Sequence, residues 1–168
     1  MFKRIENNID FAENEDKISN YWNDIDAFQK SLDIRKESKI FRFYDGPPFP
    51  TGSPHYGNLL AGVIKDIVPR YWTMRGYFVE RRFGWDVHGL PIEMEVQKEL
   101  GLEDPQDIDD YGIDKFNEAC RSQVQTNTEN WEKITRKIGR WVDFENDYKT
   151  MDVGFMESVW WVFKELFD

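Results

Sequence analysis

The spacing of apolar residues predicts helices at both ends of the chain. Between residues 14 and 31, apolar side chains recur every three to four positions, as in an amphipathic helix. The same period indicates a helix from Leu59 to Arg75 that ends at Gly76. Pro69 lies inside this helix and removes one backbone hydrogen bond, so we expect a kink there.

The second half of the sequence continues the helical pattern. Pro91 suits the first turn of a helix that runs to about Leu100. The apolar positions from Asp114 to Ile138 predict one long helix or two nearly collinear ones. Asp152 is the expected N-cap of a final amphipathic helix. Between these helices, residues 102–111 are acidic and residues 141–150 lack a pattern, so both are expected to be irregular.

Two short apolar runs predict strands at Ile40–Tyr44 and Tyr77–Phe83. With the helix between them they form a strand–helix–strand order, which favours a right-handed parallel βαβ unit. A charged link at residues 36–39 separates this unit from the amino-terminal helix. We therefore expect a helical extension at 1–39 and an α/β domain at 40–168. Because two strands cannot bury a sheet, we expect the chain to be one part of a larger α/β enzyme.

The loop after the first predicted strand is rich in proline and glycine. The stretch from Phe41 to Asn58 is FRFYDGPPFPTGSPHYGN. It places small residues (Gly46, Gly52, Gly57) before the N-terminus of a helix, whose free N–H groups and dipole favour an anion such as phosphate. The loop matches neither the P-loop nor the dinucleotide-binding pattern. A second glycine-bounded loop, GWDVHGLP (Gly84–Pro91), follows the second predicted strand, where α/β sheets bind ligands.

Composition narrows the range of functions. The 168 residues are 40 % hydrophobic, which is typical of a packed domain, and the formal net charge is −10. Because nucleic-acid binding depends on Lys and Arg, little RNA contact is expected from this acidic segment. One cysteine and two histidines do not form a zinc pattern, so no metal site is expected. No apolar run approaches the ~20 residues that span a membrane, and we expect a cytoplasmic protein.

Taken together, GPPFPTGSPHYGN and GWDVHGLPIE resemble the amino-terminal catalytic region of the isoleucyl-tRNA synthetases, a branch of the class I aminoacyl-tRNA synthetases. The stretch IGRWVDFENDYKTMD is similar to the sequence that leads to this family's editing insertion. The resemblance covers the chain from about Glu13 to Asp168. It implies the first half of a Rossmann-like catalytic domain, incomplete and ending before the editing insertion.

The resemblance also implies a reaction. Such enzymes activate isoleucine with ATP, which brings Mg²⁺, to an aminoacyl-adenylate and transfer the acyl group to tRNA(Ile). Positioning and charge stabilisation dominate a reaction of this kind. The sequence contains no KMSKS-like loop, whose lysines hold the ATP phosphates in this family. We therefore expect weak or no activity from this chain alone.

The resemblance assigns ATP binding to the first loop. Its residues there are Pro48, Thr51, Gly52, His55, Gly57 and Asn58, with His55 and Asn58 as catalytic residues. His55 occupies the first histidine of the HIGH motif and could donate a hydrogen bond to phosphate; the alternative is a polar loop residue. Asn58 replaces the last histidine of that motif, so it can donate hydrogen bonds but cannot carry charge.

The resemblance assigns amino-acid binding to Gly46, Pro47, Asp86 and His88. Asp86 matches a carboxylate that pairs with the α-ammonium group, the alternative being a cap of the next turn. Gly46 and Pro47 match an apolar wall for a branched side chain, and His88 could instead hold its loop by hydrogen bonding. Trp141, Trp160 and Trp161 are expected in the core, and Glu103–Asp110 in a solvated loop.

Three functions remain open from the sequence. The first is a fragment of an isoleucine–tRNA ligase. The second is a non-catalytic relative that binds ATP or an aminoacyl-adenylate. The third is a generic ATP-binding nucleotidyltransferase, for which an isoleucyl-adenylate analogue should bind no better than ATP.

Overall fold

The computed structural model describes residues 9–168, so part of the predicted 1–39 extension lies outside the described residues. The amino-terminal helix is two helices, α1 (Phe11–Asp24) and α2 (Ala27–Asp33). Asp26 separates them with a φ of 49°, a left-handed conformation that a helix cannot continue through. Asp10 caps α1 by accepting a hydrogen bond from the N–H of Glu13 at 3.0 Å.

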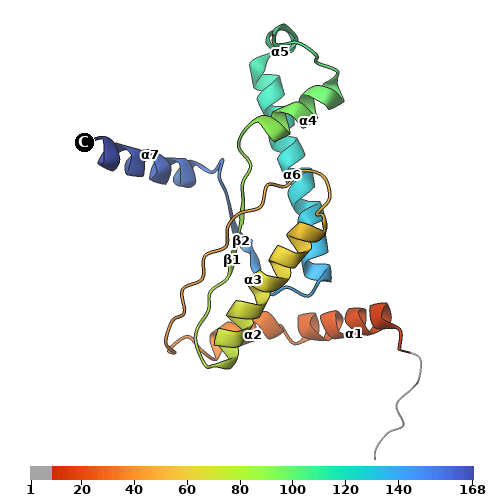
Figure 1. Cartoon of the computed structure of the whole chain (residues 1–168), viewed down its shortest axis with the longest axis vertical. Helices are drawn as coiled ribbons and strands as arrows, with labels where there is room; N and C mark the ends of the chain where they lie inside the picture. Colours follow the sequence, from red (N-terminus) through yellow and green to blue (C-terminus); the bar gives the residue numbers. More distant parts are fainter. Residues whose placement is uncertain (1–8) are drawn as a thin grey trace, which may run out of the picture.

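The long central helix α3 (Tyr56–Met74) begins earlier than the apolar pattern predicts. It starts after His55 because the side chain of that residue provides the N-terminal cap. Pro69 is buried within the helix, and Gly76, with a φ of +89°, follows its end. Figure 1 shows α3 in yellow, crossing in front of the strands.

The first predicted strand, Ile40–Tyr44, is reduced to one parallel bridge between Ile40 and Phe78. The N–H of Phe78 donates to the carbonyl of Lys39 at 3.0 Å, and the N–H of Phe41 donates back to the carbonyl of Phe78 at 2.9 Å. The chain then runs through the proline-rich loop without a further bridge until α3 begins at Tyr56. The predicted parallel connection through α3 is therefore confirmed, but a regular strand there is wrong.

A two-stranded parallel sheet forms between β1 (Arg82–Trp85) and β2 (Asp143–Lys149). β1 begins inside the second predicted strand and extends into the predicted loop Gly84–Pro91. β2 lies in the segment predicted to be irregular, which corrects that prediction. The polar sequence DFENDYK buries only Phe144, so it shows no alternation of apolar residues. The chain thus has an α/β fold with seven helices and two parallel strands within residues 9–168.

Three helices connect β1 to β2: α4 (Leu90–Leu100), α5 (Pro105–Tyr111) and α6 (Ile113–Lys137). The prediction of a helix from Pro91 is confirmed, and the Asp114–Ile138 pattern forms one long helix. Glu103–Asp110 is solvated as predicted, but most of it is a helix, so the prediction of a loop there is wrong. Pro105 starts α5, and the carboxylate of Asp107 accepts hydrogen bonds from two N–H groups that precede it, at 2.9 Å each.

The hydrophobic core lies between the two strands, α4 and α6. The chain segments around the strands contribute aromatic residues, and the two helices contribute mainly aliphatic ones. Its buried members are Phe83, Trp85, Val87, Ile92, Val96, Phe116, Val124, Trp131, Val142 and Phe144. This core fixes the carboxyl end of β1, which leads directly into the second glycine-bounded loop.

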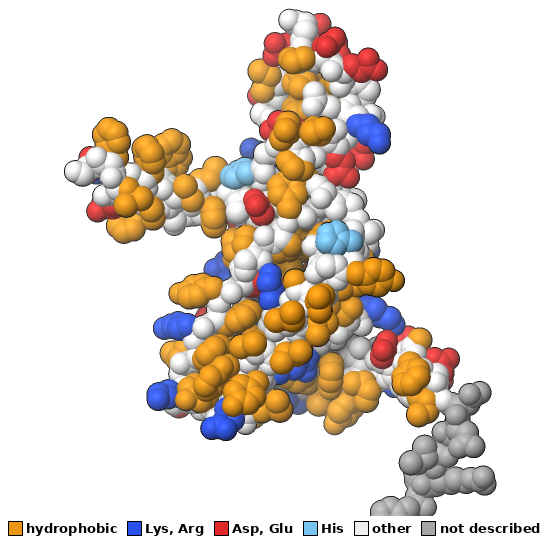
Figure 2. Space-filling model, viewed as in Figure 1, with side chains coloured by type: hydrophobic (Ala, Val, Ile, Leu, Met, Phe, Trp, Pro, Cys, Tyr) orange, Lys and Arg blue, Asp and Glu red, His pale blue; other side chains and the backbone are white. Residues whose placement is uncertain are grey.

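Two apolar helix faces are exposed. The final helix α7 (Val153–Phe167) extends away from the rest of the chain (Figure 1), and Trp160 and Trp161 are 69 % and 62 % exposed. Placing these two residues in the core is therefore wrong, whereas Trp141 is half-buried and packs edge-to-face on Trp22. Figure 2 shows a second stripe of hydrophobic side chains along α3.

Candidate active site

The side chain of His55 forms the N-terminal cap of α3. Its Nδ1 accepts a hydrogen bond from the N–H of Gly57 at 3.1 Å, and the N–H of His55 donates to Oδ1 of Asn58 at 3.0 Å. Since Nδ1 accepts, the proton of a neutral imidazole is assigned to Nε2. His55 is exposed, so Nε2–H is available to a ligand at the positive end of the helix dipole.

Gly57 allows this arrangement by having no side chain. A Cβ at that position would lie 2.9 Å from Cε1 of His55 and 3.0 Å from its Nδ1. These distances are too short, so any larger residue would displace the imidazole. Gly57 and the imidazole of His55 therefore form one structural unit.

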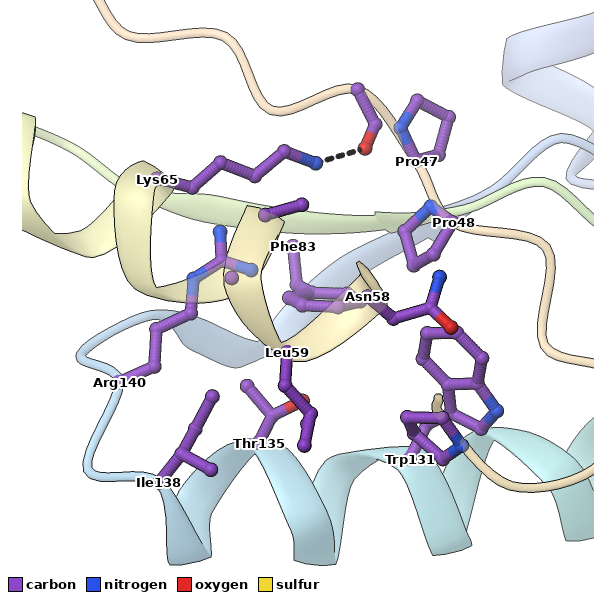
Figure 3. A pocket seen from close by; sticks show the side chains of 14 residues that line it. Pro47, Pro48, Asn58, Leu59, Lys65, Phe83, Trp131, Thr135, Ile138 and Arg140 are labelled. Atoms are coloured by element: carbon purple, nitrogen blue, oxygen red, sulfur yellow. Dashed lines mark hydrogen bonds between the residues drawn. The ribbon is translucent and has the colours of Figure 1, made fainter. Parts of the chain in front are cut away.

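The loop at residues 45–48 is held by donors from other elements. Nζ of Lys65 donates to the carbonyl of Gly46 at 2.8 Å (Figure 3), and the hydroxyl of Tyr148 donates to the carbonyl of Asp45 at 3.4 Å. The N–H of Asp86 donates to the carbonyl of Pro48 at 2.9 Å. Pro47 and Pro48 have no N–H groups to donate. The loop is therefore held mainly through its carbonyl groups, which accept hydrogen bonds from other elements. The last bond joins the two predicted ligand loops.

A buried carboxylate beside this loop was not predicted as a site residue. Oδ1 of Asp45 lies 2.6 Å from Nζ of Lys65, and Oδ2 accepts a hydrogen bond from Arg140. The Asp45 side chain is only 1 % exposed. Its partners lie 20 and 95 positions further along the sequence, so no local motif reveals the cluster.

A cavity of about 220 Å³ lies between α3, α6 and the proline-rich loop (Figure 3). Four predicted site residues line it: Gly46, Pro47, Pro48 and Asn58. Lys65 and Arg140 also face it, with Phe83, Trp131, Thr135 and Ile138 among the remaining lining residues. The cavity therefore combines apolar walls with two cationic side chains.

The other residues predicted to bind ATP lie mostly at the surface. Thr51 and Gly52 are exposed, and the indole N–H of Trp131 donates to the carbonyl of Gly52 at 2.9 Å. Gly52 has a φ of +53°, a left-handed conformation that favours glycine. This contact holds the loop to α6, whereas the apolar pattern from Asp114 to Ile138 predicts for Trp131 only a position on the face of a helix.

The second loop places Asp86 half-buried and His88 exposed. Within residues 9–168 no donor forms a hydrogen bond with the carboxylate of Asp86, and α4 begins after Gly89, so the alternative of a capping role is not supported. His88 likewise makes no side-chain hydrogen bond in this part of the chain, which does not support a loop-holding role.

Tyr148 of β2 closes the end of the sheet near these loops. Its ring packs over Gly84, where any added Cβ would clash with the phenol. Burial, followed by the charges of Asp45 and Asp86, raises the pKa of this phenol. Tyr148 was not predicted as a site residue because it lies in a strand without an apolar pattern.

Residues 9–168 contain neither a metal-binding cluster nor a membrane-spanning helix. No three His, Cys, Asp or Glu side chains among them lie together as a metal ion would require. None of the helices in this range has the length and apolar character of a transmembrane segment.

The sequence over residues 17–168 matches the family model described as tRNA synthetases class I (I, L, M and V). The chain therefore belongs to the class I tRNA synthetases of this group. It is 53 % identical, over 168 residues, to the isoleucine–tRNA ligase of Treponema denticola, and 54 % identical, over 156 residues, to the cytoplasmic isoleucine–tRNA ligase of Saccharomyces cerevisiae. The homology is thus to part of isoleucine–tRNA ligase.

These matches cover 100 % and 93 % of this chain, and the chain spans about 15 % of the length of either relative. A solved structure of LeuRS from Agrobacterium radiobacter K84, in a ternary complex with tRNA and LeuAMS, superimposes with a TM-score of 0.64 at 19 % identity. The superposition covers 91 % of this chain and 17 % of the LeuRS chain. This likeness confirms the fold as part of a class I synthetase.

Proposed function

We propose that this chain forms the part of an isoleucine–tRNA ligase that binds isoleucine and ATP and activates the amino acid. The observation that carries the proposal is the hydrogen bond from Asp86 to Pro48, which joins the two loops predicted to bind the two substrates. The similarity to two isoleucine–tRNA ligases supports isoleucine as the amino acid. The aminoacyl group would then pass to tRNA(Ile) in the cytoplasm.

In this proposal, His55 donates from Nε2 to a phosphate oxygen of ATP, and the N-terminus of α3 stabilises the charge that develops during adenylate formation. The ATP site is completed by residues of the loop and of the first turn of α3 (Pro48, Thr51, Gly52, Gly57 and Asn58), and Mg²⁺ arrives with ATP as part of the substrate. The carboxylate of Asp86 pairs with the α-ammonium group of isoleucine. Gly46 and Pro47 form the wall against its side chain, with His88 at the exposed rim.

We further propose that the isolated chain binds these ligands but turns over slowly. The reason is that the lysines of a KMSKS-type loop are not among its residues. Asn58 favours the alternative of a non-catalytic ATP- or adenylate-binding module, because its amide oxygen caps α3 and it brings no charge to the phosphates.

The test is calorimetric binding of a sulfamoyl isoleucyl-adenylate analogue, together with isoleucine-dependent pyrophosphate exchange. Binding that is tighter than ATP alone, and lost in Asp86→Ala, supports the proposal. Equal binding of the analogue and ATP would instead favour a generic nucleotide site. Exchange at the rate of a complete synthetase would contradict the slow turnover, whereas tight binding with no exchange would favour the binding module.

A further inference from the structure

The carboxylate of Asp45 is the centre of a charge cluster that connects three separate elements. Lys65 belongs to α3, Arg140 to the turn between α6 and β2, and Asp45 to the proline-rich loop. The side chains of Asp45 and Arg140 are 1 % and 6 % exposed. Charges buried to this degree require partners, so the three groups depend on one another.

The same cluster fixes the backbone next to it. Nζ of Lys65 lies 2.6 Å from Oδ1 of Asp45 and donates to the carbonyl of Gly46 at 2.8 Å. One ammonium group therefore holds both the carboxylate and the following peptide. Since Pro47 and Pro48 cannot donate hydrogen bonds, movement of Lys65 would release a large part of what holds this loop.

We propose that Asp45 is a positioning residue for amino-acid recognition. Through Lys65 and Arg140 it keeps Gly46 and Pro47 at a fixed position relative to the α3 N-terminus, where His55 lies. Lys65 thus attaches the wall for the amino-acid side chain to the same helix whose N-terminus carries the phosphate-facing cap. This inference rests on the proposed function, and it adds that amino-acid selectivity depends on a buried charge that does not contact the substrate.

The experiment compares the unaltered chain with Asp45→Asn, which keeps the shape and removes the charge. Calorimetry gives dissociation constants for the sulfamoyl isoleucyl- and valyl-adenylate analogues and for ATP. We expect the constant for the isoleucyl analogue to rise about 10- to 100-fold and the preference over the valyl analogue to shrink. The constant for ATP should change far less, which a general loss of structure would not produce.

A second variant covers the case in which Asp45→Asn fails to fold because Arg140 loses its partner. Lys65→Met keeps the pair between Asp45 and Arg140 but releases the carbonyl of Gly46, and we expect the same loss of selectivity. The matched control is Lys149→Met, since Lys149 is 25 % exposed and pairs with Asp147, compared with 31 % exposure for Lys65.

The positioning role would be overturned if Asp45→Asn and Lys65→Met both prefer the isoleucyl over the valyl analogue as strongly as Lys149→Met does. If the unaltered chain binds neither analogue, the proposed function fails and this inference fails with it. The unaltered chain therefore distinguishes the two failures, because binding by all four proteins with equal selectivity contradicts the inference alone.

Discussion

The N–H of Asp86 donates to the carbonyl oxygen of Pro48 at 2.9 Å, although the two residues lie in different loops. Pro48 follows the bridge at Ile40, and Asp86 follows β1 directly. The bond therefore brings the ends of two parallel-running segments together, as expected for ligand loops at one edge of an α/β sheet. Through this bond, the carbonyl of Pro48 and the N–H of Asp86 each find a hydrogen-bond partner in the other loop.

The capping and ligand-binding roles of His55 can be separated by substitution. Asn is a good N-cap, so His55→Asn should keep the free energy of unfolding within about 0.5 kcal/mol, whereas His55→Ala should lose about 1 kcal/mol. Both variants lack Nε2, and both should lose ATP affinity and exchange activity. Denaturant unfolding and calorimetry provide the two readings. Full ATP affinity in His55→Asn would contradict a direct role for the imidazole.

Gly57→Ala should weaken ATP binding without destabilising the chain. The added Cβ would displace the imidazole of His55, and we expect about a tenfold loss of affinity. Ala is favoured over Gly in helices by up to about 1 kcal/mol, which offsets the strain. Gly154→Ala is the matched control because Gly154 also holds the second position of a helix, with open space around it. Similar ATP affinity in Gly57→Ala and Gly154→Ala would be evidence that ATP binding does not depend on the fit between Gly57 and the imidazole of His55.

Asn58→Asp should raise stability and lower ATP affinity. The carboxylate keeps the acceptor for the N–H of His55 and adds a favourable charge in the first turn, worth about 0.3–1 kcal/mol. The same charge repels phosphate, so affinity should fall about tenfold or more. Asn20→Asp, on the exposed surface of α1, adds an equal charge elsewhere. If both variants lose affinity equally, net charge rather than position explains the loss.

Stability should fall above pH 10 in a way that depends on Tyr148. The pKa of this phenol is raised from its ordinary 10.0, first by burial and then by the charges of Asp45 and Asp86. The folded chain thus favours the neutral phenol, and this contribution is complete below pH 10 and lost as pH rises through the raised pKa. Unfolding free energies measured across this range should decline less steeply in Tyr148→Phe. Equal slopes would show that other groups cause the decline.

Helices with a regular apolar face could be predicted from the sequence, and α3, α4 and α6 illustrate this. The strand β2 could not, because its polar residues pair through the backbone and bury only Phe144. Trp160 and Trp161 show a further limit: periodicity identifies an apolar face but not what covers it. Only the structure shows that Trp160 and Trp161 are exposed.

The candidate site divides in the same way. His55, Asn58 and Asp86 belong to short motifs and could be singled out through the resemblance to the isoleucyl-tRNA synthetases; their roles in binding remain predictions. Asp45, Lys65 and Arg140 could not, because the cluster forms only when α3 and the turn after α6 pack on the proline-rich loop. Long-range ion pairs of this kind have no local sequence pattern.

The hydrogen bond from the indole of Trp131 to Gly52 gives the chain a built-in reporter. An indole N–H has its own resonance in a nitrogen-correlated NMR spectrum, and its chemical shift follows the acceptor it contacts. Any ligand that moves the glycine loop would therefore shift one signal among seven tryptophans, without a label attached to the site. Loop closure could then be followed at each step of a titration.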